Sequence, residues 1–472
     1  MSRYKVFLLN IFFLLSYAAG AEERTLEKAR EIAYDFMSSG MPATKSSVID
    51  LRMVYDGESV ATRASVVAPA YYVFDNAAGP GFVIVSGDDA ALPVLGYSDS
   101  FNFRTQGMPS NLRWWLSSMR SQINAAREAG VASSRAAANI GENVIYYETA
   151  LWDQGEPYYN ACPMDGGYRC YTGCGPTAIA IAMRYHEWPE AGVGTIPSYI
   201  TESESIRVSA RTLGTRYEWN QMPMTDGYFG SWTSTQKSQV ARLMADIGAA
   251  TLADYTADGT GIWDKDVPPA MKRYFGYDED MYVAFRQNWK TGLDQYTPSE
   301  WYSLVKEELK NGPAVYAGAD YEATMGHMFI LAGYTTNDYY YLNWGWGGMA
   351  NGYYTLDALA PEVQGSGSNG ESYHDWVTLM VNFRPEGSGD VPEPEPSIEE
   401  TTSLKYIHSP RSILITVKDG VQVRCLASDR DDVPVRRNAD GSCVIDLQGL
   451  SAGEYHIELS KDDDFKCLTF KL

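Results

Sequence analysis

The chain has 472 residues, more than a single hydrophobic core usually organises, so two or three domains are expected. Hydrophobic residues make up 45% of the chain and charged residues 21%, which is typical of a folded globular protein and excludes a wholly disordered or collagen-like chain. The formal net charge of -22 argues against a nucleic-acid-binding surface.

The first 21 residues have the pattern of a secretory signal peptide. Arg3 and Lys5 precede an apolar run over residues 6–15, and small residues follow at 18–21. A retained membrane anchor is the alternative, but the run is shorter than the roughly 20 residues that a spanning helix needs. We therefore expect cleavage before Glu22 and an exported protein, either secreted or held in the periplasm or at the cell surface, with no membrane span.

Residues 22–142 have the pattern of a small α+β unit with a pliable end. The expected elements are a helix at 24–38, strands at 71–74 and 82–85, and a helix at 112–129 with Ser110 and Asn111 as capping residues. Residues 130–142 are rich in Gly, Ala, Ser and Asn, as in segments that proteases cut. The arrangement suits a prodomain with its activation linker, and an ordinary N-terminal domain with a flexible linker is the alternative.

A cluster of three cysteines follows, at positions 162, 170 and 174. An exported protein meets oxidising conditions, so Cys162 and Cys170 could form a local disulfide. Zinc is the alternative explanation, but the cluster lacks a Cys-x2-Cys pair and no histidine stands close to Cys162 or Cys170. We expect no metal and no cofactor.

Cys174 stands where a helix is expected to begin. Gly175 and Pro176 follow it, and proline is favoured in the first turn of a helix. Unpaired N–H groups at a helix N-terminus favour a thiolate, the form of cysteine that attacks a carbonyl carbon. A buried structural cysteine is the alternative for Cys174 taken alone.

A histidine and an asparagine later in the chain strengthen the case for nucleophilic catalysis. His327 begins a strand-like run over residues 326–334, and Asn343 stands 16 positions beyond it. Cysteine, histidine and asparagine in this order are the nucleophile, base and orienting amide of papain-type enzymes. A turn residue before a glycine-rich bend is the alternative reading of Asn343.

The last part of the chain is set apart by a linker. Residues 386–397 carry glycine and serine at 387–389 and alternate proline and glutamate over 392–396, which predicts a stiff, extended segment. Residues 398–472 form short strand-like runs around turns and predict a small β-sandwich with a binding, sorting or stabilising role. The expected strands of this domain are 413–417, 421–425, 444–447 and 455–459.

The motifs together resemble the streptopain-like cysteine peptidases, a branch of the papain-like fold. The resemblance covers roughly residues 24–385. It rests on the segment from Trp152 to Tyr158, on Gly173-Cys174 with the run to Pro189, on Gly326-His327, and on Asn343 to Gly348. It implies an α+β fold, with a papain-like catalytic domain at 143–385 behind an inhibitory prodomain at 22–142 that acts as an intramolecular partner.

The resemblance also implies roles for single residues. Cys174 matches the nucleophile and His327 the general base and acid. Gln154 matches the residue that donates to the oxyanion beside the backbone N–H of Cys174, and Asn343 or Trp344 matches the place that orients and shields the histidine. The glycine- and serine-rich stretch at 364–371 resembles a mobile loop over the substrate cleft.

Some features depart from the family pattern. The residues after Cys174 are Gly175-Pro176-Thr177-Ala178, where relatives usually carry Val-Ala-Thr-Ala.

The expected function is a secreted cysteine endopeptidase made as a self-inhibited precursor, with proteins and peptides as substrates. A papain-fold acyltransferase or amidase, or a catalytically silent surface-binding protein, are the rival functions.

Overall fold

The computed structural model divides the chain into two compact units, residues 1–386 and 387–472. It describes residues 22–39, 49–56, 61–62, 65–66, 68–130, 139–227, 232–288, 294–319, 326–358 and 376–388 of the chain, and then 403–408, 411–416, 422–427, 432–438, 442–446, 454–461 and 464–471. The expected signal peptide, the glycine- and serine-rich loop at 364–371 and most of the proline-rich linker lie outside the described residues.

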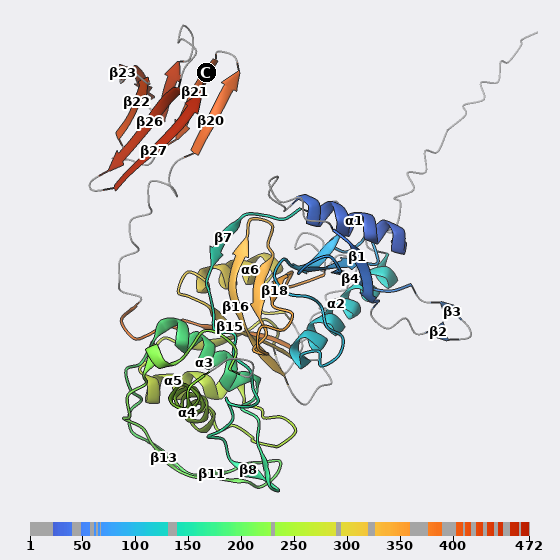
Figure 1. Cartoon of the computed structure of the whole chain (residues 1–472), viewed down its shortest axis with the longest axis vertical. Helices are drawn as coiled ribbons and strands as arrows, with labels where there is room; N and C mark the ends of the chain where they lie inside the picture. Colours follow the sequence, from blue (N-terminus) through green and yellow to red (C-terminus); the bar gives the residue numbers. More distant parts are fainter. Residues whose placement is uncertain are drawn as a thin grey trace, which may run out of the picture. The chain divides into compact units, whose positions relative to one another are not determined.

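The first unit combines helices with one large sheet (Figure 1). Its helical elements are α1 (Leu26–Ser39), α2 (Ser110–Ala129), α3 (Cys174–His186), α4 (Ser234–Ala250), α5 (Val267–Phe275), α6 (Pro298–Glu308) and the short 3-10 turns η1 (Trp219–Gln221) and η2 (Asp264–Asp266). The two helices expected before residue 130 are confirmed to within two residues at each end.

The expected caps of α2 are wrong. Pro109 is the N-cap residue and no side chain caps the helix, because Ser110 and Asn111 already belong to its first turn. The Asn111 amide oxygen accepts from the N–H of Leu112, while the Ser110 hydroxyl and the Asn111 amide nitrogen contact residues elsewhere. Thr233 and Thr297 do cap α4 and α6, in each case through a reciprocal capping box with the residue three positions on.

The large sheet contains eleven antiparallel strands, in the order β1-β4-β5-β6-β18-β17-β16-β15-β19-β14, with β7 paired to β16. These are β1 (Leu51–Tyr55), β4 (Tyr71–Asn76), β5 (Phe82–Ser86), β6 (Val94–Ser98), β7 (Asn143–Tyr146), β14 (Tyr282–Phe285), β15 (Ala314–Ala319), β16 (His327–Thr335), β17 (Tyr340–Asn343), β18 (Gly352–Tyr354) and β19 (Trp376–Val381). The strands before residue 100 join the later ones where Gly96 opposes Tyr354 and Tyr97 opposes Tyr353. One sheet thus runs through both halves of the unit.

Short two-stranded ladders complete the first unit. They are β2 (Ala61–Thr62) with β3 (Ser65–Val66), β8 (Met164–Asp165) with β9 (Tyr168–Arg169), β10 (Thr195–Ile196) with β13 (Arg211–Thr212), and β11 (Tyr199–Ile200) with β12 (Arg207–Val208).

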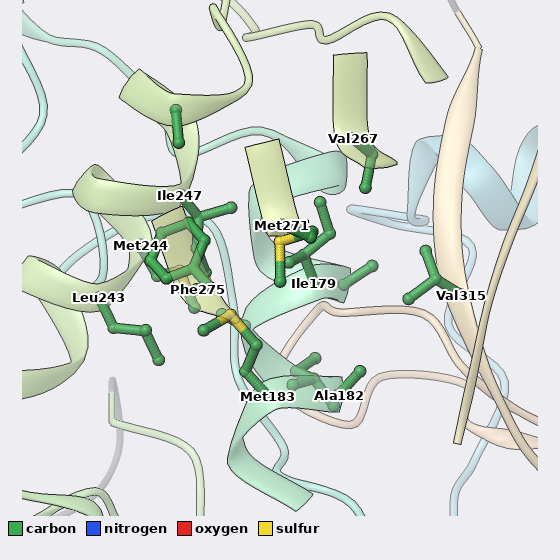
Figure 2. Packing of buried hydrophobic residues seen from close by; sticks show 14 of the residues in the cluster. Ile179, Ala182, Met183, Leu243, Met244, Ile247, Val267, Met271, Phe275 and Val315 are labelled. Atoms are coloured by element: carbon green, nitrogen blue, oxygen red, sulfur yellow. The ribbon is translucent and has the colours of Figure 1, made fainter. Parts of the chain in front are cut away.

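Three hydrophobic clusters hold the first unit together. One joins α3, α4 and α5 to β15 and β16, and Figure 2 shows its centre, where Ile179 and Met183 of α3 meet Met244 of α4 and Met271 of α5. A second joins α2 and α6 to the sheet, with side chains from both halves of the unit. The third packs α1 on β4 and β5. Helix α3, buried along residues 175–183, is therefore held rigidly where its N-terminus meets β16.

The second unit is all β, as expected. Its two four-stranded sheets have the orders β20-β21-β25-β24 and β23-β22-β26-β27. The strands are β20 (Ser403–His408), β21 (Arg411–Thr416), β22 (Gln422–Ala427), β23 (Asp432–Val433), β24 (Val435–Arg437), β25 (Cys443–Asp446), β26 (Glu454–Lys461) and β27 (Asp464–Lys471). Ile415, Cys425, Ile445 and Leu459 share its buried core. Among the residues described in the whole chain, no helix is long and apolar enough to cross a membrane.

Candidate active site

Cys174 is the first residue of α3, as the sequence predicts. The preceding residue, Gly173, has a φ of 85°, and a Cβ at this position would lie 2.3 Å from the carbonyl oxygen of Thr260. Only glycine fits such a backbone, since an L side chain would be both strained and in collision. The chain therefore makes a tight turn into the helix and presents Cys174 at its beginning.

The sulfur of Cys174 lies against the start of β16. The N–H of Met328 donates to Sγ at 3.4 Å, and Sγ lies 3.9 Å from the carbonyl oxygen of Gly326. Both residues are the immediate neighbours of His327, so the fold brings the expected nucleophile to the backbone of the expected base.

The ionisation of Cys174 differs from the sequence expectation. Burial raises the pKa of the Cys174 thiol above its ordinary value, and this effect outweighs the N–H groups of Met328 and Gly175, which lower that pKa. The helix N-terminus alone therefore does not produce a thiolate in this structure. The neutral thiol is favoured.

His327 begins β16, and its imidazole faces α2. The Nδ1 atom of His327 lies 3.3 Å from the hydroxyl oxygen of Ser110, in the first turn of that helix. Burial lowers the pKa of His327 to about 4, and the nearby Arg113 guanidinium lowers it further. The imidazole is therefore neutral at pH 7, and within the described part of the chain no hydrogen bond joins it to Cys174.

The strand register explains this orientation. His327 opposes Gly318 on β15, and a Cβ at Gly318 would lie 2.1 Å from the ring of Trp114 on α2. Because side chains alternate between the two faces of a strand, His327 belongs to the row that α2 covers. Met328, the next residue, belongs to the opposite row, and its sulfur would lie 3.4 Å from a Cβ at Gly175 of α3.

Gln154 is fixed beside the loop that leads to Cys174. Its carbonyl oxygen accepts hydrogen bonds from the N–H of Thr172 at 3.2 Å and from the hydroxyl of the same residue at 3.3 Å. The side chain is buried, and its amide nitrogen Nε2 is without a hydrogen-bond partner among the described residues. A buried donor without a partner is costly in a folded protein, so it marks a place where another acceptor is expected to bind.

Asn343 and Trp344 are both fully buried at the end of β17. The amide nitrogen of Asn343 donates to the hydroxyl of Thr149 and to the carbonyl oxygen of Ala150, both at 2.9 Å. Its amide oxygen accepts from the N–H of Gly345 at 3.1 Å. The structure thus uses Asn343 to tie this bend to residues 149–150, and its described hydrogen bonds do not include one to His327.

Trp344 lies beneath the row that contains His327. Its ring contacts Phe329 with a centroid separation of 4.9 Å, and its indole N–H donates to the carbonyl oxygen of Ala350 at 3.0 Å. Its own carbonyl oxygen accepts from the side-chain amide of Asn111 at 2.6 Å. Helix α2 thus contacts both His327 and the adjacent bend.

Sequence reasoning missed the part that α2 plays here. Ser110 and Asn111 were interpreted as helix caps, yet they reach residues 217 and 233 positions away in the chain. Asn351, whose side-chain oxygen accepts from the N–H of Trp344 at 3.0 Å, was also missed. The signal that could have found Ser110 and Asn111 is the pair of tryptophans that follows them, since two adjacent large apolar residues on one helix imply an extensive docking surface.

The remaining cysteines near the site are free thiols. Cys162 and Cys170 are buried in the cluster around α3, and burial raises the pKa of Cys162 to about 12 and that of Cys170 to about 11. Over the residues that the structure describes, no group of three His, Cys, Asp or Glu side chains is placed to hold a metal ion.

Comparison with known proteins agrees with this geometry. Residues 152–354 match the Peptidase C10 family, and residues 21–123 match the Spi protease inhibitor family. Residues 152–354 thus carry a peptidase domain of the C10, or streptopain-like, family. The resemblance expected from the sequence is confirmed, and so is the enzyme class.

Named relatives come from several bacteria. The thiol protease/hemagglutinin PrtT of Porphyromonas gingivalis is 30% identical over 392 residues, which cover 78% of this chain and 43% of PrtT. Streptopain of Streptococcus pyogenes is 27% identical over 387 residues, which cover 77% of this chain and 92% of streptopain. The chain therefore spans less than half of PrtT and nearly all of streptopain.

A solved structure carries the same arrangement of inhibitor and peptidase. The prointerpain A fragment of Prevotella intermedia superposes with a TM-score of 0.56 at 25% identity, covering 71% of this chain and 99% of that fragment. The C10 chain described here is thus an α+β peptidase with an inhibitor-type prodomain, and the expected fold class is confirmed.

Proposed function

We propose that this C10 peptidase is secreted as a self-inhibited precursor and hydrolyses peptide bonds of proteins, with Cys174 as nucleophile and His327 as general base and acid. The observation that carries the proposal is the placement of the Cys174 sulfur between the backbone groups of the two residues that flank His327.

In the proposed reaction, His327 takes the proton of the Cys174 thiol and the thiolate attacks the carbonyl carbon of the scissile bond. The oxyanion that forms accepts from the backbone N–H of Cys174 and from the Nε2 amide of Gln154, which is buried and without a described partner. His327 then protonates the leaving amine, and water hydrolyses the acyl-enzyme.

We propose that α2 keeps the precursor inactive. It holds the His327 imidazole toward Ser110, and the buried thiol and imidazole of the site are both neutral in this state. Removal of residues 22–142 by a cut between about 127 and 143 would release the imidazole and leave a catalytic domain at 143–385. Figure 1 shows α2 running beside the strands of that domain.

The β-sandwich at 398–472 lacks a described catalytic grouping, and we propose a binding, sorting or stabilising role for it.

The test is a comparison of the purified precursor with its Cys174→Ala variant under mild reducing conditions, following intact mass with time. We expect the unmodified chain alone to shorten, and N-terminal sequencing to place the new start between residues 127 and 143. Cys443→Ala, in the second unit, is the matched cysteine control and should process normally. Self-cleavage by the Cys174→Ala variant would reject the assigned nucleophile. Transfer of the acyl group to an added amine in preference to water would favour an acyltransferase.

A further inference from the structure

A second set of residues outside α2 lines the first turn of α3. A Cβ at Gly175, next to the nucleophile, would lie 2.4 Å from Cδ1 of Ile262 and 3.4 Å from the sulfur of Met328. These two apolar side chains flank the turn that carries Cys174. Met328 is buried in the core and Ile262 is partly exposed, so Ile262 is the apolar side chain that a substrate residue near the scissile bond could meet on this side.

The same segment carries a carboxylate. Asp264, two residues after Ile262, opens η2 and is only partly exposed. Its Oδ2 atom accepts a hydrogen bond of 2.6 Å from the hydroxyl of Thr378 on β19. This bond fixes the direction of the carboxylate, because Thr378 is itself buried in the central sheet.

The sheet register connects this carboxylate to the nucleophile. Thr378 opposes Ala317 on β15, and Ala317 opposes Met328 on β16, so the three side chains form one row on the face toward α3. Met328 ends the row, and its N–H donates to the Cys174 sulfur. Asp264 is thus anchored to Thr378 and Cys174 to the backbone of Met328, with Ala317 between these two residues in the row.

The electrostatics agree with this geometry. Burial raises the pKa of Asp264, and the hydrogen bond from Thr378 lowers it; when the carboxyl is ionised, its charge raises the pKa of the Cys174 thiol. Lys265, the nearest cation in sequence, lies 5.5 Å from the ring of Trp263. Within the described residues no lysine or arginine forms an ion pair with Asp264. A partly desolvated carboxylate of this kind gains most from a cation that arrives with the substrate.

We propose that Asp264 selects substrates that carry a lysine or arginine side chain close to the scissile bond. The stem of such a residue would lie along Ile262 while its cationic end reaches the carboxylate held by Thr378. This inference rests on the proposed peptidase function and adds a specificity-determining residue to it.

The experiment uses the mature enzyme obtained from the full chain and pairs of peptides that differ at one position, lysine in one and norleucine in the other. Successive peptide pairs place this lysine or norleucine at each position from the third residue before the scissile bond to the second residue after it. At one position we expect kcat/KM for the lysine peptide to exceed that for the norleucine peptide by about tenfold, the order of one charge-assisted contact. In the Asp264→Asn variant this ratio should fall toward one.

Asp266→Asn, in the same 3-10 turn, is the matched control and should keep the ratio of the unmodified enzyme. A thiol-reactive probe titrates the competent active sites in each preparation, so a misfolded variant is recognised. A preference for norleucine at every position would overturn the inference, and so would a lysine preference that persists in Asp264→Asn. In both cases cleavage of the peptides would still support the proposed peptidase function. An equal loss on both peptides would show that Asp264 positions the catalytic groups instead. Failure of the unmodified enzyme to cleave any peptide would reject the peptidase function itself.

Discussion

The Nδ1 atom of His327 and the hydroxyl oxygen of Ser110 lie 3.3 Å apart, although 217 residues separate them in the chain. Asn111, the next residue of α2, donates from its side chain to the carbonyl oxygen of Trp344. Two successive residues at one helix start thus contact the expected general base and the bend beside it. This relationship makes α2 the element that determines where the imidazole points.

Replacing Ser110 by alanine should weaken the hold of α2 on His327. A single hydrogen bond contributes about 0.5–1.5 kcal/mol, so we expect self-processing of the precursor to quicken by roughly two- to tenfold. The measurement is the half-life of the intact precursor by mass spectrometry. Ser121→Ala, at an exposed position of the same helix, should leave that half-life unchanged. An unchanged half-life for Ser110→Ala would mean that other contacts of α2 dominate the inhibition.

Replacing Gln154 by alanine should remove one of the two expected oxyanion donors. We expect kcat to fall by about 10²–10³-fold with little change in KM, because the donor acts on the charge of the transition state. Gln154→Glu preserves the size of the side chain but lacks the N–H donor, and should be equally impaired. Labelling by a thiol-reactive probe should persist in both variants. Near-normal kcat in either variant would assign the oxyanion contact to other groups.

Glu308, at the end of α6, should make stability depend on pH. Burial raises its pKa from 4.5 to about 7, although the N–H groups of Asn382 and Phe383 donate to its carboxylate and lower that pKa. Between pH 4.5 and about 7, Glu308 therefore keeps its proton in the folded protein and loses it in the unfolded chain. It follows that the contribution of Glu308 to stability is present below pH 4.5 and is lost as the pH rises to about 7.

The corresponding measurement is urea unfolding at pH 5 and pH 8, in a Cys174→Ala background that cannot process itself. Tryptophan fluorescence reports on the first unit alone, since none of the 12 tryptophans lies beyond residue 376. Between the two pH values, Glu308 should account for roughly 3 kcal/mol of stability loss that Glu308→Gln does not show. The exposed neighbour Glu307 is the control, and Glu307→Gln should follow the unmodified chain. Equal pH dependence in Glu308→Gln would assign the titration to another group.

The ion pair between Arg286 and Asp357 is almost fully buried, with side-chain exposures of 2% and 1%. Asp357→Asn removes the negative charge of this pair from beside a buried guanidinium, so we expect the free energy of unfolding to fall by about 3–5 kcal/mol. Asp338→Asn breaks the partly exposed pair with Lys306 and should change that free energy by less than about 1 kcal/mol. The same fluorescence-detected unfolding measures both. A small effect of Asp357→Asn would show that neighbouring groups stabilise Arg286 without it.

Local patterns predicted the elements that carry the chemistry. Helix α3 begins at Cys174 and β16 begins at His327, as expected, because Gly173 and Pro176 mark the start of the helix and Gly326 precedes a continuous apolar run. The all-β tail followed from the same patterns, whereas the α+β fold of the catalytic domain was implied by the family resemblance. These features depend on residues close together in the chain.

The features that the sequence did not predict depend on packing between distant segments. Burial, which no local pattern reports, raises the pKa of Cys174 against the effect of its helix N-terminus. Asn343 stands at papain-like spacing from His327, yet its amide binds Thr149 and Ala150, from a segment nearly 200 residues earlier. The docking of Ser110 on His327 likewise arises only when α2 packs on the sheet.

The continuous sheet and the hydrophobic cluster shared by its two halves have one further consequence. Tyr97 of β6 pairs with Tyr353 of β18, and their rings stack with centroids 5.1 Å apart, so β18 has a strand neighbour on this side in the precursor. A mature enzyme that has lost β6 would lack this neighbour, and we expect it to keep its shape through a slow unfolding rate and not through ready refolding. Unfolding would then be reversible in the precursor and irreversible in the mature enzyme. Proteolytic activation would therefore limit the lifetime of each active molecule.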